Sequence, residues 1–302
     1  MNSNQKAIQA LENNDYEDAL LYFQKALVES RDVQSLTNQA WFYIHEEMEY
    51  EKALALVEEA IQLNPTSYFP YCLLGEIYLL LKKWQDAKEI LAQAPTLPSS
   101  KATYNNLAIA NYQLGNLKEA SANFLLAADK SDWDMFGHVK CLIDLGEASE
   151  AKGKLGQFSE NDDEFVGSID VADLYVELGL YKEAVEWFEK GWVEYLKQSE
   201  WISRYVYALF KLGNSTRTEQ ILEESIAHQT IEIKKASAEE CDEDWTQSDK
   251  QNHIKQLWEE KEEYEQLIER ISSGHIPALK FEPVIQSDCY LFGCTRHNHA
   301  EY

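Results

Sequence analysis

The chain has 302 residues, with 53 Asp and Glu against 27 Lys and Arg, so its formal net charge is −26. Like charge repels phosphate groups, which argues against unassisted binding to nucleic acid or to an anionic membrane and favours a basic partner. The alternative interpretation is that the acidic surface only keeps the molecule in solution.

No feature of the sequence indicates secretion or membrane insertion. Residues 1–8 contain no apolar signal core, and no run approaches the roughly 20 apolar residues that span a bilayer. Five cysteines in a chain of this length do not form the pattern of a disulfide framework. We therefore expect reduced thiols and a cytoplasmic protein.

Two stretches that lie 33 residues apart share one pattern. The first is Tyr71-x-x-Leu74-Gly75-x-x-Tyr78, followed by Trp84-x-x-Ala87 and Leu91. The second is Tyr104-x-x-Leu107-Ala108-x-x-Asn111, followed by Gly115-x-Leu117-x-x-Ala120 and Phe124. Both resemble the tetratricopeptide repeat, a helix-turn-helix unit of about 34 residues. The resemblance implies an all-α superhelical solenoid whose concave surface binds a ligand without catalysis.

Small residues on the second helix of each unit mark the register of about seven repeats over residues 1–237. They are Ala19, Ala53, Ala87, Ala120, Ala151, Ala184 and Thr218. The facing positions on the first helix are also small, at Ala7, Gly75, Ala108 and Ala172. Small residues are expected there because the two helices of a hairpin cross closely.

Two of the repeats depart from the pattern. In the second, Ala40 takes the small position only if the turn before Tyr50 holds one inserted residue; otherwise the bulky Trp41 would occupy it. The fifth, over residues 133–158, is short and carries Gly146, Gly153 and Gly156, and a glycine weakens a helix by about 1 kcal/mol relative to Ala. This unit is either a hinge or a degenerate repeat that packs normally.

An acidic segment, 238–274, follows the repeats. Its residues 239–270 carry 12 acidic and 4 basic side chains. Ser248-x-x-Gln251 predicts the start of a helix that ends near Ser272. Its apolar stripe consists of Ile254, Leu257, Trp258, Leu267, Ile268 and Ile271. We expect this helix to cap the solenoid; the alternative is that it binds a separate partner.

The resemblance implies that a ligand lies along the first helices of the repeats. The matching inward positions are Trp41, Glu76, Asn105, Ile109, Tyr112, Asp173 and Tyr207. An Asn side chain can form hydrogen bonds with both the donors and the acceptors of a peptide backbone, and aromatic rings supply apolar anchors. The alternative for each aromatic side chain is that it packs between repeats and does not contact a ligand. The second to fourth repeats lack the Lys and Arg with which chaperone-binding members of this family grip a carboxylate. A protein or peptide with basic residues is therefore the expected partner.

The C-terminal tail, 275–302, contains Cys289, Cys294, His297 and His299 within 11 residues. Two thiols and two imidazoles are a ligand set that suits structural Zn²⁺. The alternative function is thus a zinc module in the tail, with the repeats as its platform. Without metal, the tail is either flexible or folded back on the last repeats through Phe281, Tyr290, Leu291 and Phe292.

The sequence contains no local catalytic motif, such as a phosphate-binding loop, a His-Glu-x-x-His helix or a Gly-x-Ser-x-Gly turn. The leading hypothesis is a non-catalytic cytoplasmic scaffold that holds a protein or peptide in the groove of the repeats.

Overall fold

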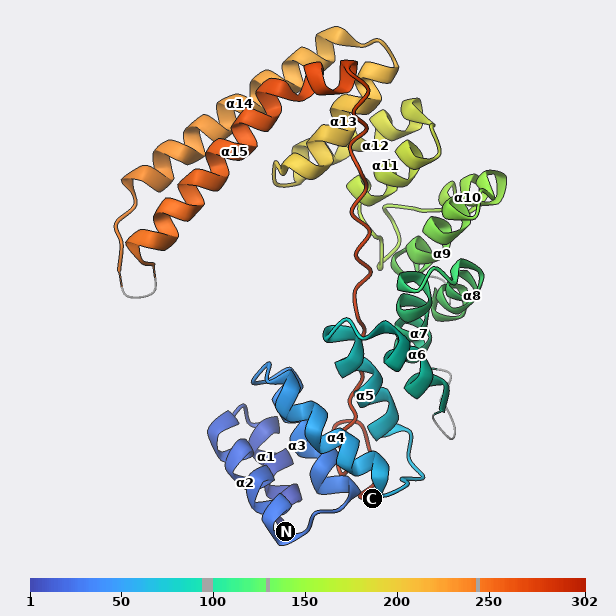
Figure 1. Cartoon of the computed structure of the whole chain (residues 1–302), viewed down its shortest axis with the longest axis vertical. Helices are drawn as coiled ribbons and strands as arrows, with labels where there is room; N and C mark the ends of the chain where they lie inside the picture. Colours follow the sequence, from blue (N-terminus) through green and yellow to red (C-terminus); the bar gives the residue numbers. More distant parts are fainter. Residues whose placement is uncertain (94–99, 129–130, 243–244) are drawn as a thin grey trace. The chain divides into compact units, whose positions relative to one another are not determined.

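The computed structural model describes residues 1–93, 100–128, 131–242 and 245–302, and within them it contains fifteen α-helices and no strand. The predicted all-α class is therefore confirmed (Figure 1). The helices are α1 (Ser3–Glu12), α2 (Tyr16–Glu29), α3 (Val33–His45), α4 (Tyr50–Gln62), α5 (Phe69–Leu80), α6 (Trp84–Gln93), α7 (Lys101–Gln113), α8 (Leu117–Ala128), α9 (Asp132–Asp144), α10 (Ala148–Leu155), α11 (Ser168–Glu177), α12 (Tyr181–Glu194), α13 (Ser199–Lys211), α14 (Ser215–Ala238) and α15 (Gln247–Ser272). Residues 243 and 244 of the acidic segment lie outside the described residues.

The helices form hairpins in which the predicted register is buried. The pairs α1 and α2, α3 and α4, α5 and α6, α7 and α8, α11 and α12, and α13 and α14 pack against each other. The six marker alanines of the second helices and Thr218 are all buried, as are Ala7, Ala108 and Ala172 on the facing helices. In α14, Ile221 fills the core position that follows Thr218. The small residues thus identify where each hairpin closes.

The second repeat contains the predicted insertion. Residues 46–49 join α3 to α4, one residue more than the turn 13–15 between α1 and α2. Met48 in this turn has a φ of 55°, a left-handed conformation that L-residues seldom adopt. Ala40 is fully buried whereas Trp41 is only partly so, which confirms that Ala40 holds the small position.

The chain divides into two compact units, which we describe separately. Unit 1 comprises Met1–Leu145 and Pro283–Tyr302, and unit 2 comprises Gly146–Glu282. The boundary falls between α9 and α10, inside the predicted fifth repeat. In unit 1 the first helices of successive repeats are in contact, since α5 packs against both α3 and α7.

In unit 2, α15 packs against α14 and α13 and so caps the end of the repeats, as predicted. Its N-cap is Thr246, which exchanges hydrogen bonds with Asp249, so the predicted cap at Ser248 was wrong by two residues. The predicted apolar stripe was also wrong at Trp258, which is 53% exposed, while Tyr264 is buried. None of the described helices is long and apolar enough to cross a membrane.

Candidate functional site

An extended segment of the chain itself, residues 283–302, lies against the first helices of unit 1, where Figure 1 draws it in dark red. Asn38 on α3 donates from Nδ2 to the Phe292 carbonyl oxygen (3.0 Å), and its Oδ1 accepts from the Phe292 amide (2.8 Å). Asn106 on α7 does the same with Gln286, at 2.7 Å and 3.0 Å. Each side-chain amide therefore pairs with both main-chain polar groups of one residue.

Further hydrogen bonds follow the same segment through the groove. Asn105 donates to the Val284 carbonyl oxygen (2.8 Å), and the Ser287 hydroxyl donates to Glu76 on α5. At the end of the chain, the Tyr302 amide donates to Gln34 Oε1 (2.8 Å). The segment is thus held from both of its ends and in its middle.

Three consecutive apolar side chains anchor the segment. Tyr290, Leu291 and Phe292 are almost fully buried. The Phe292 ring lies 4.9 Å from the ring of Phe69 on α5, and Leu291 packs with Phe42 on α3. The segment therefore folds back on the first repeats, and the expectation that these residues would contact the last repeats was wrong.

Glu76 lies beneath the segment in an environment that disfavours its charge. Its side chain is 2% exposed, and this burial raises the pKa of the carboxyl group to about 7. The hydrogen bond from Ser287 lowers this pKa, and the negative charge of Asp288 in the segment raises it further. His45 Nε2 lies 3.7 Å from Glu76 Oε1. Burial lowers the pKa of His45 to about 4, so at neutral pH the imidazole is uncharged and does not compensate the carboxylate.

The other predicted groove residues have several different environments. Trp41 packs against the cluster that contains Leu291, and Ile109 is buried on α7. The Tyr112 hydroxyl donates to Asp144 Oδ2 at 2.9 Å. In unit 2, Asp173 accepts from Arg204 Nε at 2.5 Å, and the Tyr207 ring meets Tyr181 edge-on at 5.8 Å. The structure thus brings Glu76 and Asn105 onto the segment, while Tyr112, Asp173 and Tyr207 contact side chains of neighbouring helices.

Sequence reasoning missed Asn38 and Asn106, although a signal for them exists. Each lies two residues before the small residue of its first helix, Ala40 and Ala108. Gln5 occupies the same place before Ala7, and its Nε2 donates to Glu301 Oε1 at 2.6 Å. A search for polar residues at this one register position would have found the groove contacts of three repeats.

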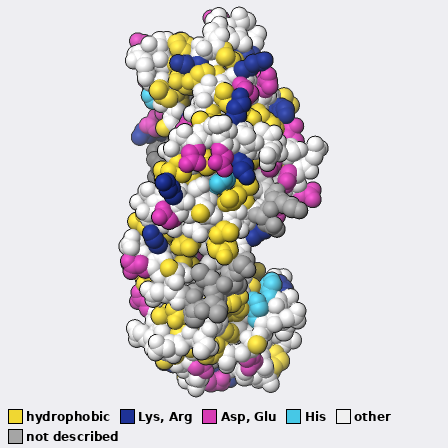
Figure 2. Space-filling view, turned by 90° about the vertical axis from the view of Figure 1, so that its right-hand side faces the viewer, with side chains coloured by type: hydrophobic (Ala, Val, Ile, Leu, Met, Phe, Trp, Pro, Cys, Tyr) yellow, Lys and Arg dark blue, Asp and Glu magenta, His cyan; other side chains and the backbone are white. Residues whose placement is uncertain are grey.

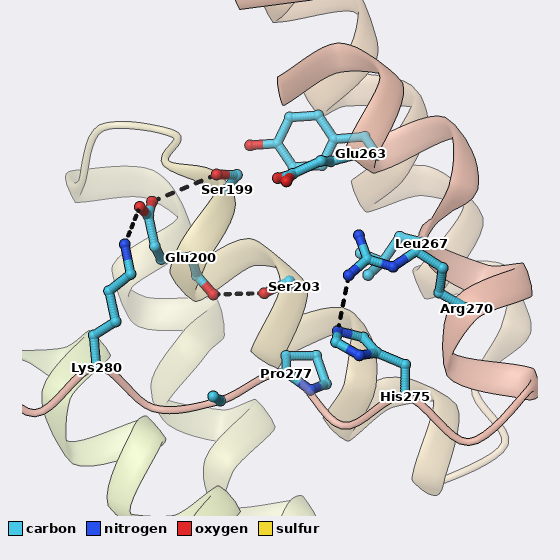
Figure 3. A pocket seen from close by; sticks show the side chains of 11 residues that line it. Ser199, Glu200, Ser203, Glu263, Leu267, Arg270, His275, Pro277 and Lys280 are labelled. Carbon is cyan, nitrogen blue, oxygen red and sulfur yellow. Dashed lines mark hydrogen bonds and ion pairs between the residues drawn. The ribbon is translucent and has the colours of Figure 1, made fainter. Parts of the chain in front are cut away.

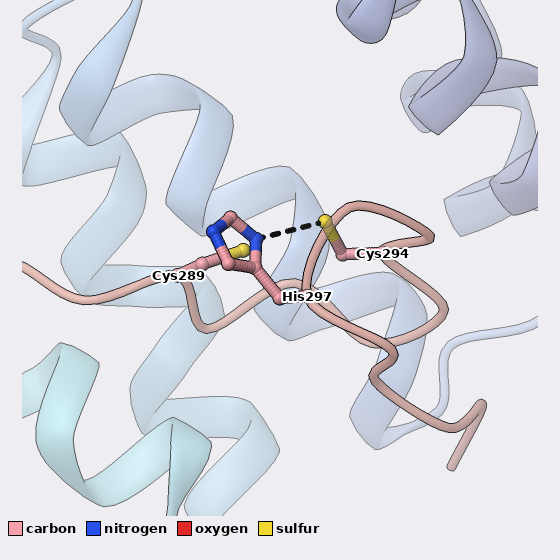
Figure 4. A group of neighbouring side chains, drawn as sticks. All are labelled: Cys289, Cys294 and His297. Carbon is pink, nitrogen blue, oxygen red and sulfur yellow. Dashed lines mark hydrogen bonds between the residues drawn. The ribbon is translucent and has the colours of Figure 1, made fainter.

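Three of the four predicted metal ligands converge beside the groove. The thiols of Cys289 and Cys294 and a ring nitrogen of His297 lie within 4.8 Å of one another, and Figure 4 shows these side chains pointing toward each other. Cys294 Sγ is 3.3 Å from His297 Nδ1, and burial raises the pKa of Cys289. His299 Nδ1 instead bonds the Leu291 carbonyl oxygen at 3.0 Å.

A cavity of about 350 Å³ in unit 1 adjoins this cluster. Its wall includes all three converging side chains together with Trp41, His45 and Glu46. Unit 2 has a separate cavity of about 310 Å³ whose rim carries an ion pair between Lys280 and Glu200 at 3.0 Å (Figure 3). On the face shown in Figure 2, basic side chains are scattered among acidic and apolar ones.

Two segments match sequence models described as tetratricopeptide repeat, over residues 45–97 and 169–191. The chain is a tetratricopeptide repeat protein. Both matches agree with the hairpins of the structure, since the first ends past α6 and the second runs from α11 into α12. Arrays of such repeats form extended concave surfaces that bind ligands.

Solved structures share this fold. A tetratricopeptide repeat protein from Parabacteroides merdae is 15% identical, with 86% of this chain and 99% of that one covered and a TM-score of 0.58. PilW, a type IV pilus biogenesis factor, is 23% identical, with 65% of this chain and 93% of that one covered and a TM-score of 0.53. Acl4, an assembly chaperone of RpL4, is 14% identical, with 71% of this chain and 96% of that one covered and a TM-score of 0.52. At these identities the likeness concerns the fold alone. A search of curated proteins found no match.

Proposed function

We propose that this tetratricopeptide repeat protein is a non-catalytic scaffold whose unit 1 groove binds an extended protein or peptide segment in place of residues 283–302. The observation that carries the proposal is the pairing of Asn38 and Asn106 with both main-chain groups of Phe292 and Gln286. Hydrogen bonds to main-chain groups can form with a segment of any sequence. The apolar pockets filled by Tyr290 and Phe292 therefore supply the selectivity for a partner. A partner that takes this place must offer comparable apolar side chains.

The groove also supports the proposal of a basic partner. The chain's own segment places Asp288 near Glu76, where the like charge raises the pKa of that carboxyl group further above its burial-shifted value. A Lys at the corresponding position of a partner would pair with Glu76. Because the whole chain carries a net charge of −26, a basic segment also gains in its rate of association.

An exchange experiment tests the groove. A protease site inserted between Glu282 and Pro283 is cut after the full chain has folded, and release of the labelled fragment 283–302 is followed while unlabelled peptide is added. We expect the fragment to stay bound and then to exchange. Asn38→Ala should speed its release by tenfold or more, since the buried main-chain groups of Phe292 lose hydrogen bonds worth about 1–3 kcal/mol. Asn252→Ala, at an exposed position on α15, is the control.

The basic preference is tested with two versions of the competing peptide, one with the native Asp288 and one with Asp288→Lys. The lysine version should displace the fragment at lower concentration, and its advantage should shrink as salt is added. Equal competition by both peptides contradicts the basic partner, whereas immediate loss of the fragment without rebinding contradicts the groove itself.

A further inference from the structure

The turn that carries Cys289, Cys294 and His297 is held in shape by main-chain hydrogen bonds that do not involve the three side chains. Gly293, with a φ of 79°, donates to the Ala300 carbonyl oxygen (3.0 Å), and His299 donates to that of Cys294 (2.9 Å). The Thr295 hydroxyl also donates to Glu12 on α1 at 2.5 Å. These bonds fix the loop that carries Cys294 and His297, so less order must be imposed on that loop when an ion binds.

We propose that Cys289, Cys294 and His297 bind one Zn²⁺ ion, with the fourth coordination position open toward the cavity of unit 1. A tetrahedral zinc ion with bonds of about 2.3 Å to sulfur and about 2.0 Å to nitrogen places its ligand atoms roughly 3.5–3.8 Å apart. The three atoms lie within 4.8 Å of one another, so small side-chain rotations suffice. All three ligands belong to residues 283–302, so the site forms while this segment of the chain occupies the groove.

The donor set selects the ion. Thiolate and imidazole ligands suit zinc, while calcium and magnesium prefer oxygen ligands. On binding, each of the two thiols loses its proton to solvent, and His297 coordinates as the neutral imidazole. The two negative thiolates then neutralise the charge of the ion.

The fourth position is left to a ligand from outside the cluster, because His299 is not among the residues whose ligand atoms converge. Two residues that line the adjoining cavity, Trp41 and His45, have ring nitrogens (Nε1 and Nε2) that are buried without a hydrogen-bond partner among the described residues. A water molecule on the ion fits this polar setting in the free protein. The site thus differs from the four-ligand structural site expected from the sequence pattern.

Metal content of the full chain, purified without a polyhistidine tag and measured by mass spectrometry, tests the site. Wild-type protein should contain about one zinc per chain after incubation with Zn²⁺ and removal of excess ion. Cys294→Ser and His297→Gln should weaken zinc binding by tenfold or more in competition with a chromophoric chelator. Cys241→Ser, at an exposed thiol in unit 2, and His299→Gln should both retain the ion.

Substitution with Co²⁺ adds a readout of the ligands themselves, because thiolate coordination produces a charge-transfer absorption that water and carboxylates do not. This band should be present in wild type, weaker in Cys289→Ser and unchanged in His299→Gln. The circular dichroism of each variant checks that it is folded. Less than about a tenth of an equivalent of zinc in wild type, equal zinc in Cys294→Ser, or a Cys289–Cys294 disulfide in protein kept under reducing conditions would overturn the site.

Discussion

Burial of Glu76 links the stability of unit 1 to pH. The pKa of this carboxyl group rises from an ordinary value near 4.5 in the unfolded chain to about 7 in the folded one. The folded state therefore binds the proton more tightly, and stability is lost as pH rises from about 4.5 through 7. The His45 imidazole from α3 and Asp288 from the tail face the same site, and neither offers a positive charge at neutral pH.

Glu76→Gln should remove this penalty. Gln retains an oxygen that accepts from Ser287, and it carries no charge. The variant should exceed wild type in free energy of unfolding by less than about 1 kcal/mol at pH 5 and by up to about 3 kcal/mol at pH 8, since one pKa unit corresponds to about 1.4 kcal/mol. Urea unfolding of both proteins at the two pH values measures the difference. If the difference in free energy of unfolding between the two proteins is the same at both pH values, Glu76 is not the source of the pH dependence.

Arg204 is a buried cation of unit 2 that pairs with two acidic side chains. It is 2% exposed, and it bonds Asp173, Glu177 and the Pro277 carbonyl oxygen. Arg204→Met should cost about 3–5 kcal/mol, because it leaves Asp173 buried without its partner. The matched control is Arg217→Met, whose more exposed pair with Glu189 should contribute about 1 kcal/mol or less. Urea unfolding compares them, and equal losses would show that burial does not decide the effect.

At the scale of the helix, two glycines with different surroundings show the effect of close packing apart from the effect of helix propensity. A Cβ atom on Gly75 of α5 would lie 2.5 Å from Leu91 Cδ2 on α6, whereas a Cβ on Gly153 of α10 meets nothing within 4 Å. Gly75→Ala should therefore destabilise unit 1 by roughly 1–2 kcal/mol, since overpacking outweighs the helical gain. Gly153→Ala should stabilise unit 2 by about 1 kcal/mol. Thermal unfolding of the two variants checks both signs, and stabilisation by Gly75→Ala would contradict the close crossing.

The helical hairpins were predictable because their determinants are local. A small residue such as Ala40 or Ala108 recurs with the repeat and marks each crossing. The groove contacts of Asn38 were not predictable in this way, because its partner Phe292 lies 254 residues later in a segment without periodicity. Trp258 shows a second limit: helical spacing places it beside the apolar stripe, but only the positions of α13 and α14 decide that Tyr264 is the side chain that is buried.

At the scale of the whole molecule, unit 1 is assembled from two distant parts of the chain. Residues 283–302 belong to it although unit 2 separates them from Leu145 in sequence. The long connection makes the pairing costly in chain entropy, but the cost grows only slowly with the length of the loop. Tyr290, Leu291 and Phe292 offset it, because full burial of each contributes about 1.5–3 kcal/mol.

Deleting residues 283–302 should therefore weaken unit 1 alone, by about 5 kcal/mol or more, a large part of the stability of a typical domain. Hydrogen exchange measured by mass spectrometry distinguishes the units: α3, α5 and α7 should exchange faster, while α11 to α14 keep the protection of the full chain. Val284→Ala, at an exposed side chain of the same segment, should leave both units unchanged. Unchanged protection of α3 after the deletion would contradict the role of the segment in unit 1, and faster exchange throughout α11 to α14 would contradict the independence of unit 2.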